Sequence, residues 1–241
     1  MINLLLSILA GLAAFAAFRL SGLVHAVGAI LPGLVAVGVT YFFLARRTMR
    51  QFEAIMGVAQ KELAQRKLDR AVAVMESAFA LSRWQFLVAS QLHGQIGSLL
   101  YVQKKFDEAE PHLKKAFIKM WAARAMLAAQ HYKRRDFKAM EDTFEAAVRA
   151  NKGESLLYAV YAWCQEKRGE KSRAIEILQR GVEQNKSDER LKTLLGRVQN
   201  DKRMKMDAFG QEWDQFWLET PKMMQQPGGG GFGVRQFRNR R

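Results

Sequence analysis

The sequence has few of the residues and patterns that mark a sheet or a disulfide framework. Its 241 residues include only four prolines, five tyrosines and one cysteine, Cys164. A single cysteine cannot form an intramolecular disulfide, and it fits a reducing compartment. No segment shows the alternation of apolar and polar residues that is typical of a strand. We therefore expect an all-α chain.

Patterns typical of catalytic and metal sites are also missing. The four histidines are dispersed, and none stands at metal-ligand spacing from the cysteine or from another histidine. The run of four glycines at 228–231 follows no predicted strand, so it does not indicate a phosphate-binding loop. We predict a protein that is not an enzyme and that has no catalytic residues, cofactor or metal ion.

Positive charge, in contrast, is in excess. Lysine and arginine total 38 against 23 aspartate and glutamate residues, which gives a net charge of +15. Such a balance indicates anionic neighbours, which could be phospholipid headgroups, nucleic acid or an acidic protein.

Two long apolar runs begin the chain. Residues 2–18 and 23–45 contain no charged side chain, and a short polar break at 19–22 separates them. As a helix the second run would span about 34 Å, enough to cross a hydrocarbon core of about 30 Å, and the first about 25 Å. Nothing basic precedes the first run, which argues against a signal peptide. We predict a transmembrane helical hairpin anchor over residues 1–45.

The orientation of this hairpin follows from the basic residues beside it. Arg46, Arg47 and Arg50 come directly after the second run, whereas Arg19 is the sole basic residue in the turn. The positive-inside rule then places both termini in the cytoplasm and makes the chain a multi-pass protein of the inner membrane. The three arginines after the second run should contact anionic lipid headgroups.

One helix-turn-helix unit recurs within residues 46–203. Each copy has a polar turn and then an anchor residue, with an apolar residue four positions later and a small one three after that. The anchors lie 38, 31 and 34 residues apart. Small residues at these positions let two antiparallel helices approach closely. The anchors are Ala71, Ala109, Met140 and Ala174.

This pattern, with Gly97 and Gly196 in the first-helix slots, resembles the tetratricopeptide-repeat family, whose period is about 34 residues. The resemblance implies a solenoid of about four degenerate copies that binds a protein partner along its first helices. The repeat register places five side chains in this partner-binding groove. An alternative is that the aromatic residues among them pack between adjacent units. The five are Tyr101, Tyr132, Lys133, Trp163 and Lys167.

The residues after the repeats fall into two parts. Residues 204–220 carry Phe209, Trp213, Phe216 and Trp217 at helical spacing, which predicts a helix that caps the solenoid. The alternative is a helix that binds a partner or a membrane surface. The tail at 221–241 is rich in glycine and arginine, and we predict that it is disordered. Its arginines could contact anionic lipid or RNA: Arg235, Arg238, Arg240 and Arg241.

The order of these parts resembles that of membrane-anchored repeat proteins of bacterial envelopes. We predict a scaffold or adaptor that holds a protein partner at the cytoplasmic face of the membrane. Two alternatives stay open. One is a nucleic-acid-associated protein that uses its basic surface and tail. The other is a homo-oligomeric membrane assembly, in which small hairpin residues such as Gly11 and Gly33 let helices of several copies pack.

Overall fold

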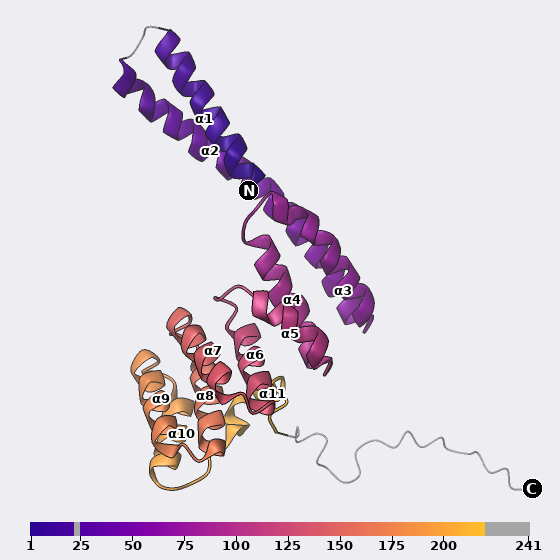
Figure 1. Cartoon of the computed structure of the whole chain (residues 1–241), viewed down its shortest axis with the longest axis vertical. Helices are drawn as coiled ribbons and strands as arrows, with labels where there is room; N and C mark the ends of the chain where they lie inside the picture. Colours follow the sequence, from indigo (N-terminus) through magenta and orange to yellow (C-terminus); the bar gives the residue numbers. More distant parts are fainter. Residues whose placement is uncertain (22–24, 220–241) are drawn as a thin grey trace, which may run out of the picture. The chain divides into compact units, whose positions relative to one another are not determined.

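The computed structural model describes residues 1–21 and 25–219 (Figure 1). In this part of the chain every regular element is a helix, with two long apolar helices first and a helical repeat region after them. The predicted all-α class is therefore confirmed. The fold divides between Ala123 and Arg124 into two compact units, each with its own internal contacts.

The first unit opens with two antiparallel helices that pack along each other (Figure 1). The second of them continues past the apolar run without interruption, so the predicted membrane segment and the first repeat helix form one helix of 39 residues. Four further helices complete the repeats of this unit. The elements are α1 (Ile2–Leu20), α2 (Ala26–Ala64), α3 (Leu68–Ser77), the 3₁₀ helix η1 (Ala78–Arg83), α4 (Val88–Val102) and α5 (Phe106–Lys115).

The helices of the hairpin are held close together by glycine. A Cβ atom on Gly11 would lie 2.9 Å from the Gly33 carbonyl oxygen and would also collide with the side chain of Val37. Gly33 follows Pro32 inside α2, and both residues are accommodated within a continuous helix. The small residues at this point therefore serve contact between α1 and α2.

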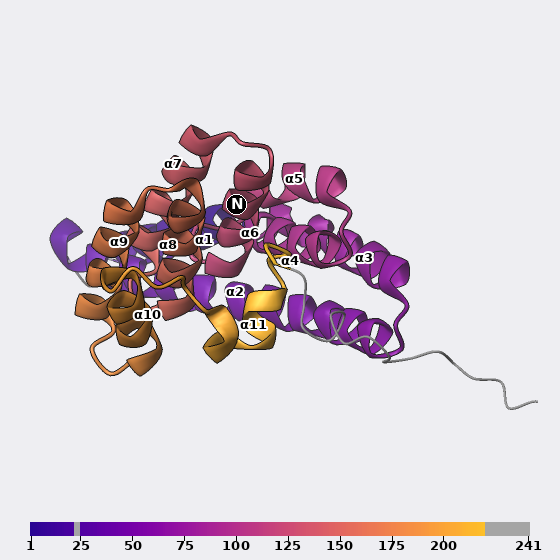
Figure 2. The same cartoon turned by 90° about the horizontal axis from the view of Figure 1, so that it is seen from below.

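The second unit contains most of α6 and the helices that follow it. Within it α8 packs between α7 and α9, and α9 packs on α10; Figure 2 shows α8, α9 and α10 side by side. The bounds are α6 (Trp121–Lys133), α7 (Phe137–Ala150), α8 (Ser155–Arg168), α9 (Lys171–Gln184) and α10 (Glu189–Gln199).

In the described part of the chain, the same turn ends the first helix of every repeat. One or two positions past the helix, a residue adopts a left-handed conformation, and the next N–H donates to a carbonyl five residues back, as Lys105 does to Leu100 at 3.0 Å. This is the Schellman arrangement. The turns follow one another at 38, 31, 34 and 32 residues, and they mark four helical hairpins and a fifth first helix, α10. The left-handed residues are Arg66, Lys104, Arg135, Gly169 and Asp201.

The four anchor residues of the repeat lie in the core. Ala71, Ala109, Met140 and Ala174 are all completely buried. A larger side chain would not fit at other small positions of the motif, because a Cβ on Gly181 would come within 2.9 Å of Tyr158. The spacing read from the sequence thus corresponds to places where two helices of a hairpin approach.

The chain after α10 differs from the predicted helix. Up to residue 219 it forms only two short helical elements, η2 (Met206–Phe209) and α11 (Gln211–Asp214). Gly210 between them has a φ angle of 51°, and Trp217 has one of 52°. These left-handed residues interrupt the helical register, so the regular spacing of the aromatic residues does not produce one continuous helix.

Candidate functional site

The hairpin formed by α1 and α2 has an inverted distribution of polar and apolar side chains. The buried residues of α1 are Asn3, Ser7 and Gly11, and their spacing of four residues places them on one stripe. Large apolar residues such as Leu9 and Leu12 face outward and are about 60% exposed. By length and composition both α1 and α2 could cross a membrane, and little of either apolar stretch is buried within the protein.

A polar cluster closes the base of the hairpin. The Asn3 side-chain amide donates to the Thr48 hydroxyl at 2.9 Å and to Gln85 Oε1 at 3.4 Å. Gln85 in turn donates to the Tyr41 hydroxyl at 3.2 Å. The cluster joins α1, α2 and the loop after η1. Sequence reasoning missed it, although the spacing of Asn3 and Ser7 in an otherwise apolar run was a visible signal.

Basic and aromatic side chains surround this base. Arg46, Arg47 and Arg50 are all exposed, and together with Phe43 and Gln51 they line an open pocket. The Arg46 guanidinium lies 6.0 Å from the centre of the Phe42 ring. Trp84 and Phe86 in the loop after η1 are also exposed, by 40% and 56%. Trp84 and Arg47 line one pocket beside Asn3 and Thr48, and tryptophan and arginine are residues that suit a boundary between lipid and water.

Two of the five predicted groove residues lie in the core. Tyr101 is fully buried and packs edge-to-face on Phe106, with ring centres 4.9 Å apart. Trp163 is 3% exposed and lies against Tyr132 at 5.9 Å and Trp213 at 5.1 Å. Both aromatics therefore pack between helices of the protein, as the alternative interpretation of the sequence expects.

The other three predicted groove residues reach solvent. Tyr132 is half-buried, and burial raises the pKa of its hydroxyl group above the ordinary value. Lys133 and Lys167 are exposed, and the Lys167 ammonium group stands 5.2 Å above the centre of the Trp163 ring. Contact of these residues with a partner stays a prediction.

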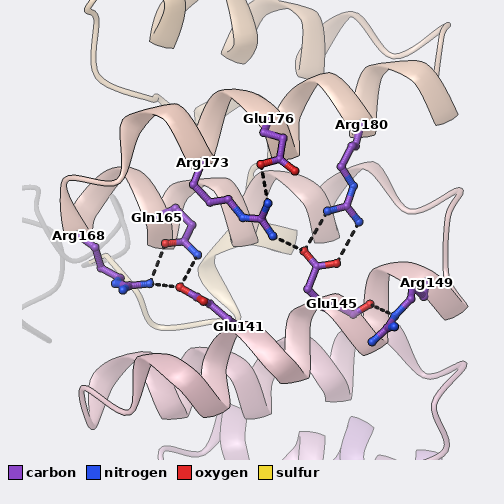
Figure 3. A network of polar contacts seen from close by, with 8 residues as sticks. All are labelled: Glu141, Glu145, Arg149, Gln165, Arg168, Arg173, Glu176 and Arg180. Carbon is purple, nitrogen blue, oxygen red and sulfur yellow. Dashed lines mark hydrogen bonds and ion pairs between the residues drawn. The ribbon is translucent and has the colours of Figure 1, made fainter.

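A network of charged residues joins α7, α8 and α9 (Figure 3). Glu145 on α7 accepts hydrogen bonds from Arg173 at 3.0 Å and from Arg180 at 2.9 and 3.1 Å. Glu141, one turn earlier, accepts from Gln165 at 3.0 Å and from Arg168. Sequence reasoning missed this network, because linear spacing does not show which charges on different helices meet.

The electrostatics of the network favour the ionised carboxylates. Burial alone would raise the pKa of Glu145, but the hydrogen bonds and charge of Arg180, together with Arg173, outweigh it and lower that pKa. The pKa of Glu141 is lowered in the same way, because Gln165 and Arg168 outweigh its burial. The network thus ties adjacent repeat units to each other.

Other candidate chemistry is sparse in the described residues. Within 1–21 and 25–219, no group of three or more histidine, cysteine, aspartate or glutamate side chains could hold a metal ion. Cys164 is completely buried, and burial raises the pKa of its thiol, so the group is not poised to react. The predicted lipid contacts of the tail lie outside the described residues: Arg235, Arg238, Arg240 and Arg241.

Comparison with known proteins agrees with part of this geometry. No curated protein matches the chain. Residues 132–198 match the sequence profile of the tetratricopeptide repeat, and this stretch runs from the end of α6 to near the end of α10. The repeat is typically a non-catalytic scaffold that binds other proteins. The sequence resemblance is therefore confirmed for residues 132–198, and it suggests protein–protein interaction as the general role of this part of the chain.

Proposed function

We propose that this protein is a membrane-anchored scaffold, in which the α1–α2 hairpin spans the inner membrane and the repeats hold a protein partner on the cytoplasmic side. The observation that carries the anchoring is the inverted packing of α1. Asn3, Ser7 and Gly11 face α2 while leucines face outward. Polar and small residues at a helix contact, with apolar residues outside, are what a lipid environment favours.

The base of the hairpin supports the orientation. Arg46, Arg47 and Arg50 follow the apolar part of α2 and are exposed, so they can contact anionic headgroups on the cytoplasmic side. Since α2 runs without a break into the first repeat, no flexible spacer separates anchor and repeats. A partner bound by the first repeats is thereby held close to the bilayer.

Thiol labelling tests the anchoring and its orientation. In a Cys164→Ala background, Ser21→Cys places a thiol at the tip of the hairpin, and Gln51→Cys places one just past its base; both positions are exposed. A membrane-impermeant maleimide should label Ser21→Cys in intact spheroplasts and Gln51→Cys only in inverted vesicles. Labelling of both thiols from the same side would exclude a hairpin that crosses the membrane.

Partner binding needs a separate test that leaves the core intact. We expect a stoichiometric protein to co-purify with the full-length chain from native membranes in mild detergent. It should be lost with Lys133→Glu plus Lys167→Glu, because these exposed side chains lie at predicted groove positions. The control is Lys138→Glu plus Lys186→Glu, which makes the same charge change at exposed positions elsewhere. Equal loss in both pairs would argue against the groove.

A further inference from the structure

Between α10 and residue 219, where the described part of the chain ends, no second helix of a fifth repeat unit is formed. Asp201 ends α10 with the same left-handed turn that Lys104 and Gly169 form at the ends of α4 and α8. After α4 and α8 a second helix of ten or more residues follows at once. After α10 come an irregular stretch and the four-residue turns η2 and α11. We call residues 204–219 the C-terminal segment.

The C-terminal segment is buried despite its scarcity of regular structure. Five of its large side chains are no more than 5% exposed. A stretch with so few helical hydrogen bonds of its own is held in place mainly by what its side chains touch. The five are Met204, Met206, Phe209, Trp213 and Phe216.

One group of these contacts is made with α8. The Trp213 ring packs edge-to-face on Trp163, with ring centres 5.1 Å apart. The Met204 backbone N–H donates to Glu166 at 2.8 Å. Lys167, which stands over the Trp163 ring, is the next residue along α8. The segment therefore covers the part of α8 that the sequence assigned to partner binding.

A second group of contacts is made with α10. The guanidinium of Arg190 lies 4.5 Å from the centre of the Phe209 ring, which is a cation–π distance. At the other end of α10, Arg197 donates from Nε to the Arg203 carbonyl oxygen at 2.9 Å, just before the segment begins. The segment thus bridges α8 and α10, which are the first helices of consecutive units.

Charge also distinguishes the segment from the rest of the chain. It carries four acidic residues and one lysine, a net charge of −3, in a protein whose net charge is +15. The first-helix side chains beside it include the cations of Lys167, Arg190 and Arg197. Aromatic anchors interspersed with carboxylates, beside these three cations, are the kind of stretch that binds to a helical repeat as a peptide.

We propose that the C-terminal segment is a displaceable internal ligand: it occupies the partner surface of α8 and α10 until an acidic partner segment with aromatic anchors replaces it. The inference rests on the proposed function, because it concerns the surface through which the repeats hold a partner. It also gives the partner a chemical description, namely a stretch of about 16 residues with two or three aromatic side chains interspersed with carboxylates.

A competition experiment on the full-length protein in mild detergent tests the inference. The probe is a fluorescent synthetic peptide of residues 204–219, titrated by anisotropy. In the wild-type protein the tethered segment competes at a high effective concentration, so binding should be weak. Trp213→Ala with Phe216→Ala in the protein removes two anchors of the tethered copy. We expect this variant to bind the peptide at least about tenfold more tightly than the wild type does.

Two controls define the surface involved. A peptide with the same two alanines should not bind either protein, because it lacks the anchors. Adding Lys167→Glu to the anchor-depleted protein should weaken binding of the intact peptide, since it places a carboxylate over the Trp163 ring. Equal affinity of the peptide for wild type and anchor-depleted protein would overturn the inference.

A protein whose C-terminal segment can be severed by a protease covers the case in which the alanine variant is too unstable to assay. A protease site placed at residues 201–203, which are exposed, allows the segment to be severed while it is still bound. An internal ligand should then exchange with excess labelled peptide while α8–α10 keep their amide protection. Failure to exchange, or unfolding of these helices on exchange, would contradict displacement. Neither readout involves a membrane or a cellular partner, so the outcome is separate from that of the proposed function.

Discussion

Helices α1 and α8 each contain a stretch of consecutive apolar residues, but the surroundings of the two stretches are opposite. Every residue of α8 from Leu156 to Gln165 is buried, whereas only Asn3, Ser7 and Gly11 of α1 are. The difference lies in the neighbours. α8 is enclosed by α7, α9 and the C-terminal segment, and α1 has one long neighbour, α2. The protein itself leaves the apolar side chains of α1 uncovered, and by length and composition α1 and α2 could cross a bilayer.

The comparison also shows two uses of small residues. In the hairpin, Gly11 lets two helices meet with their apolar side chains outside. In the repeats, Gly97 and Gly181 let helices meet with large apolar and aromatic side chains packed inside. The same residue type therefore gives close helix contact in the hairpin and in the repeats, and substitutions at these positions can separate the two cases.

The largest effect is expected at the glycine contact of the hairpin. Gly11→Val would place its side chain against Val37 and the Gly33 carbonyl, and should force α1 and α2 apart. We expect a cost of about 1–3 kcal/mol, as for overpacking in a tight contact. It should appear as a lower apparent melting temperature of the full-length protein in mild detergent.

Gly38→Val is the matched control for this prediction, because a Cβ at position 38 meets nothing within 4 Å. It should leave the melting temperature nearly unchanged. If Gly38 is instead part of a contact between copies of the chain, its valine variant should shift the protein toward the monomer in detergent. Equal destabilisation by both valines would show that the Gly11 contact is not what holds the hairpin.

The next largest effect is expected at Gly97, which occupies the same position of the repeat as Gly196. A Cβ on Gly97 of α4 would lie 3.0 Å from His112 and Leu113 of α5, whereas a Cβ on Gly196 of α10 meets nothing within 4 Å. No second helix covers Gly196 in the described part of the chain. We expect Gly97→Ala to destabilise by about 1–2 kcal/mol. Gly196→Ala should stabilise by about 0.5–1 kcal/mol, because alanine is the better helix former.

Denaturant titration of both alanine variants against the wild type measures this pair. Opposite changes in the free energy of unfolding would establish that this glycine position of the repeat is a packing position only where a second helix follows. Destabilisation by Gly196→Ala would mean that α10 has a close neighbour that the structure does not show, such as a second copy of the chain.

The repeat anchors and the apolar runs show how much of the fold the sequence could predict. The anchors Ala71, Ala109 and Ala174 could be placed because the repeat imposes a period, and each proves to be buried where two helices approach. The apolar runs could be recognised because hydropathy is local. Period and hydropathy were sufficient for the helical class and for most of the repeat register. Neither property reveals which helix covers which position.

Contacts between distant residues were not predictable in the same way. The bond between Asn3 and Thr48 spans 45 residues, and nothing in either local pattern links them. Trp163 was correctly placed on a first helix, but its cover comes from Trp213, fifty residues later in a segment that is not the regular helix expected there. Trp217 in a left-handed conformation has no sequence signal at all, since tryptophan rarely adopts it.

A smaller effect is expected from the network that joins α7 to α9. Glu145→Gln keeps the shape of the side chain but removes the charge that Arg173 and Arg180 share. These side chains are 24% to 37% exposed, so solvent screens the pairs, and we expect a loss of about 1 kcal/mol. Glu183→Gln on the exposed face of α9 is the control and should be nearly neutral.

The same network predicts a dependence on pH. The pKa values of Glu141 and Glu145 are lower in the folded protein than in the unfolded chain, where the pKa of a glutamate is about 4.3. Their contribution to stability is therefore complete above that pH and is lost as the pH falls through the folded pKa values. Denaturant midpoints should fall more steeply below about pH 4.3 in the wild type than in Glu145→Gln. Parallel curves would show that the charge is not coupled to folding.

The smallest effect is expected at His93 and His112, whose Nδ1 atoms lie 3.2 Å apart between α4 and α5. Burial lowers the pKa of both rings, and the charge of Lys115 lowers each further. The folded state therefore favours the neutral rings, so their contribution to stability is complete above the ordinary pKa of about 6.5 and declines as the pH falls below it.

Stability measured between pH 7.5 and 5.5 should decrease in the wild type and in the control His131→Gln. It should decrease less in His112→Gln, which removes the repulsion between two protonated rings. An unchanged slope in His112→Gln would mean that the ring pair is not the group that titrates.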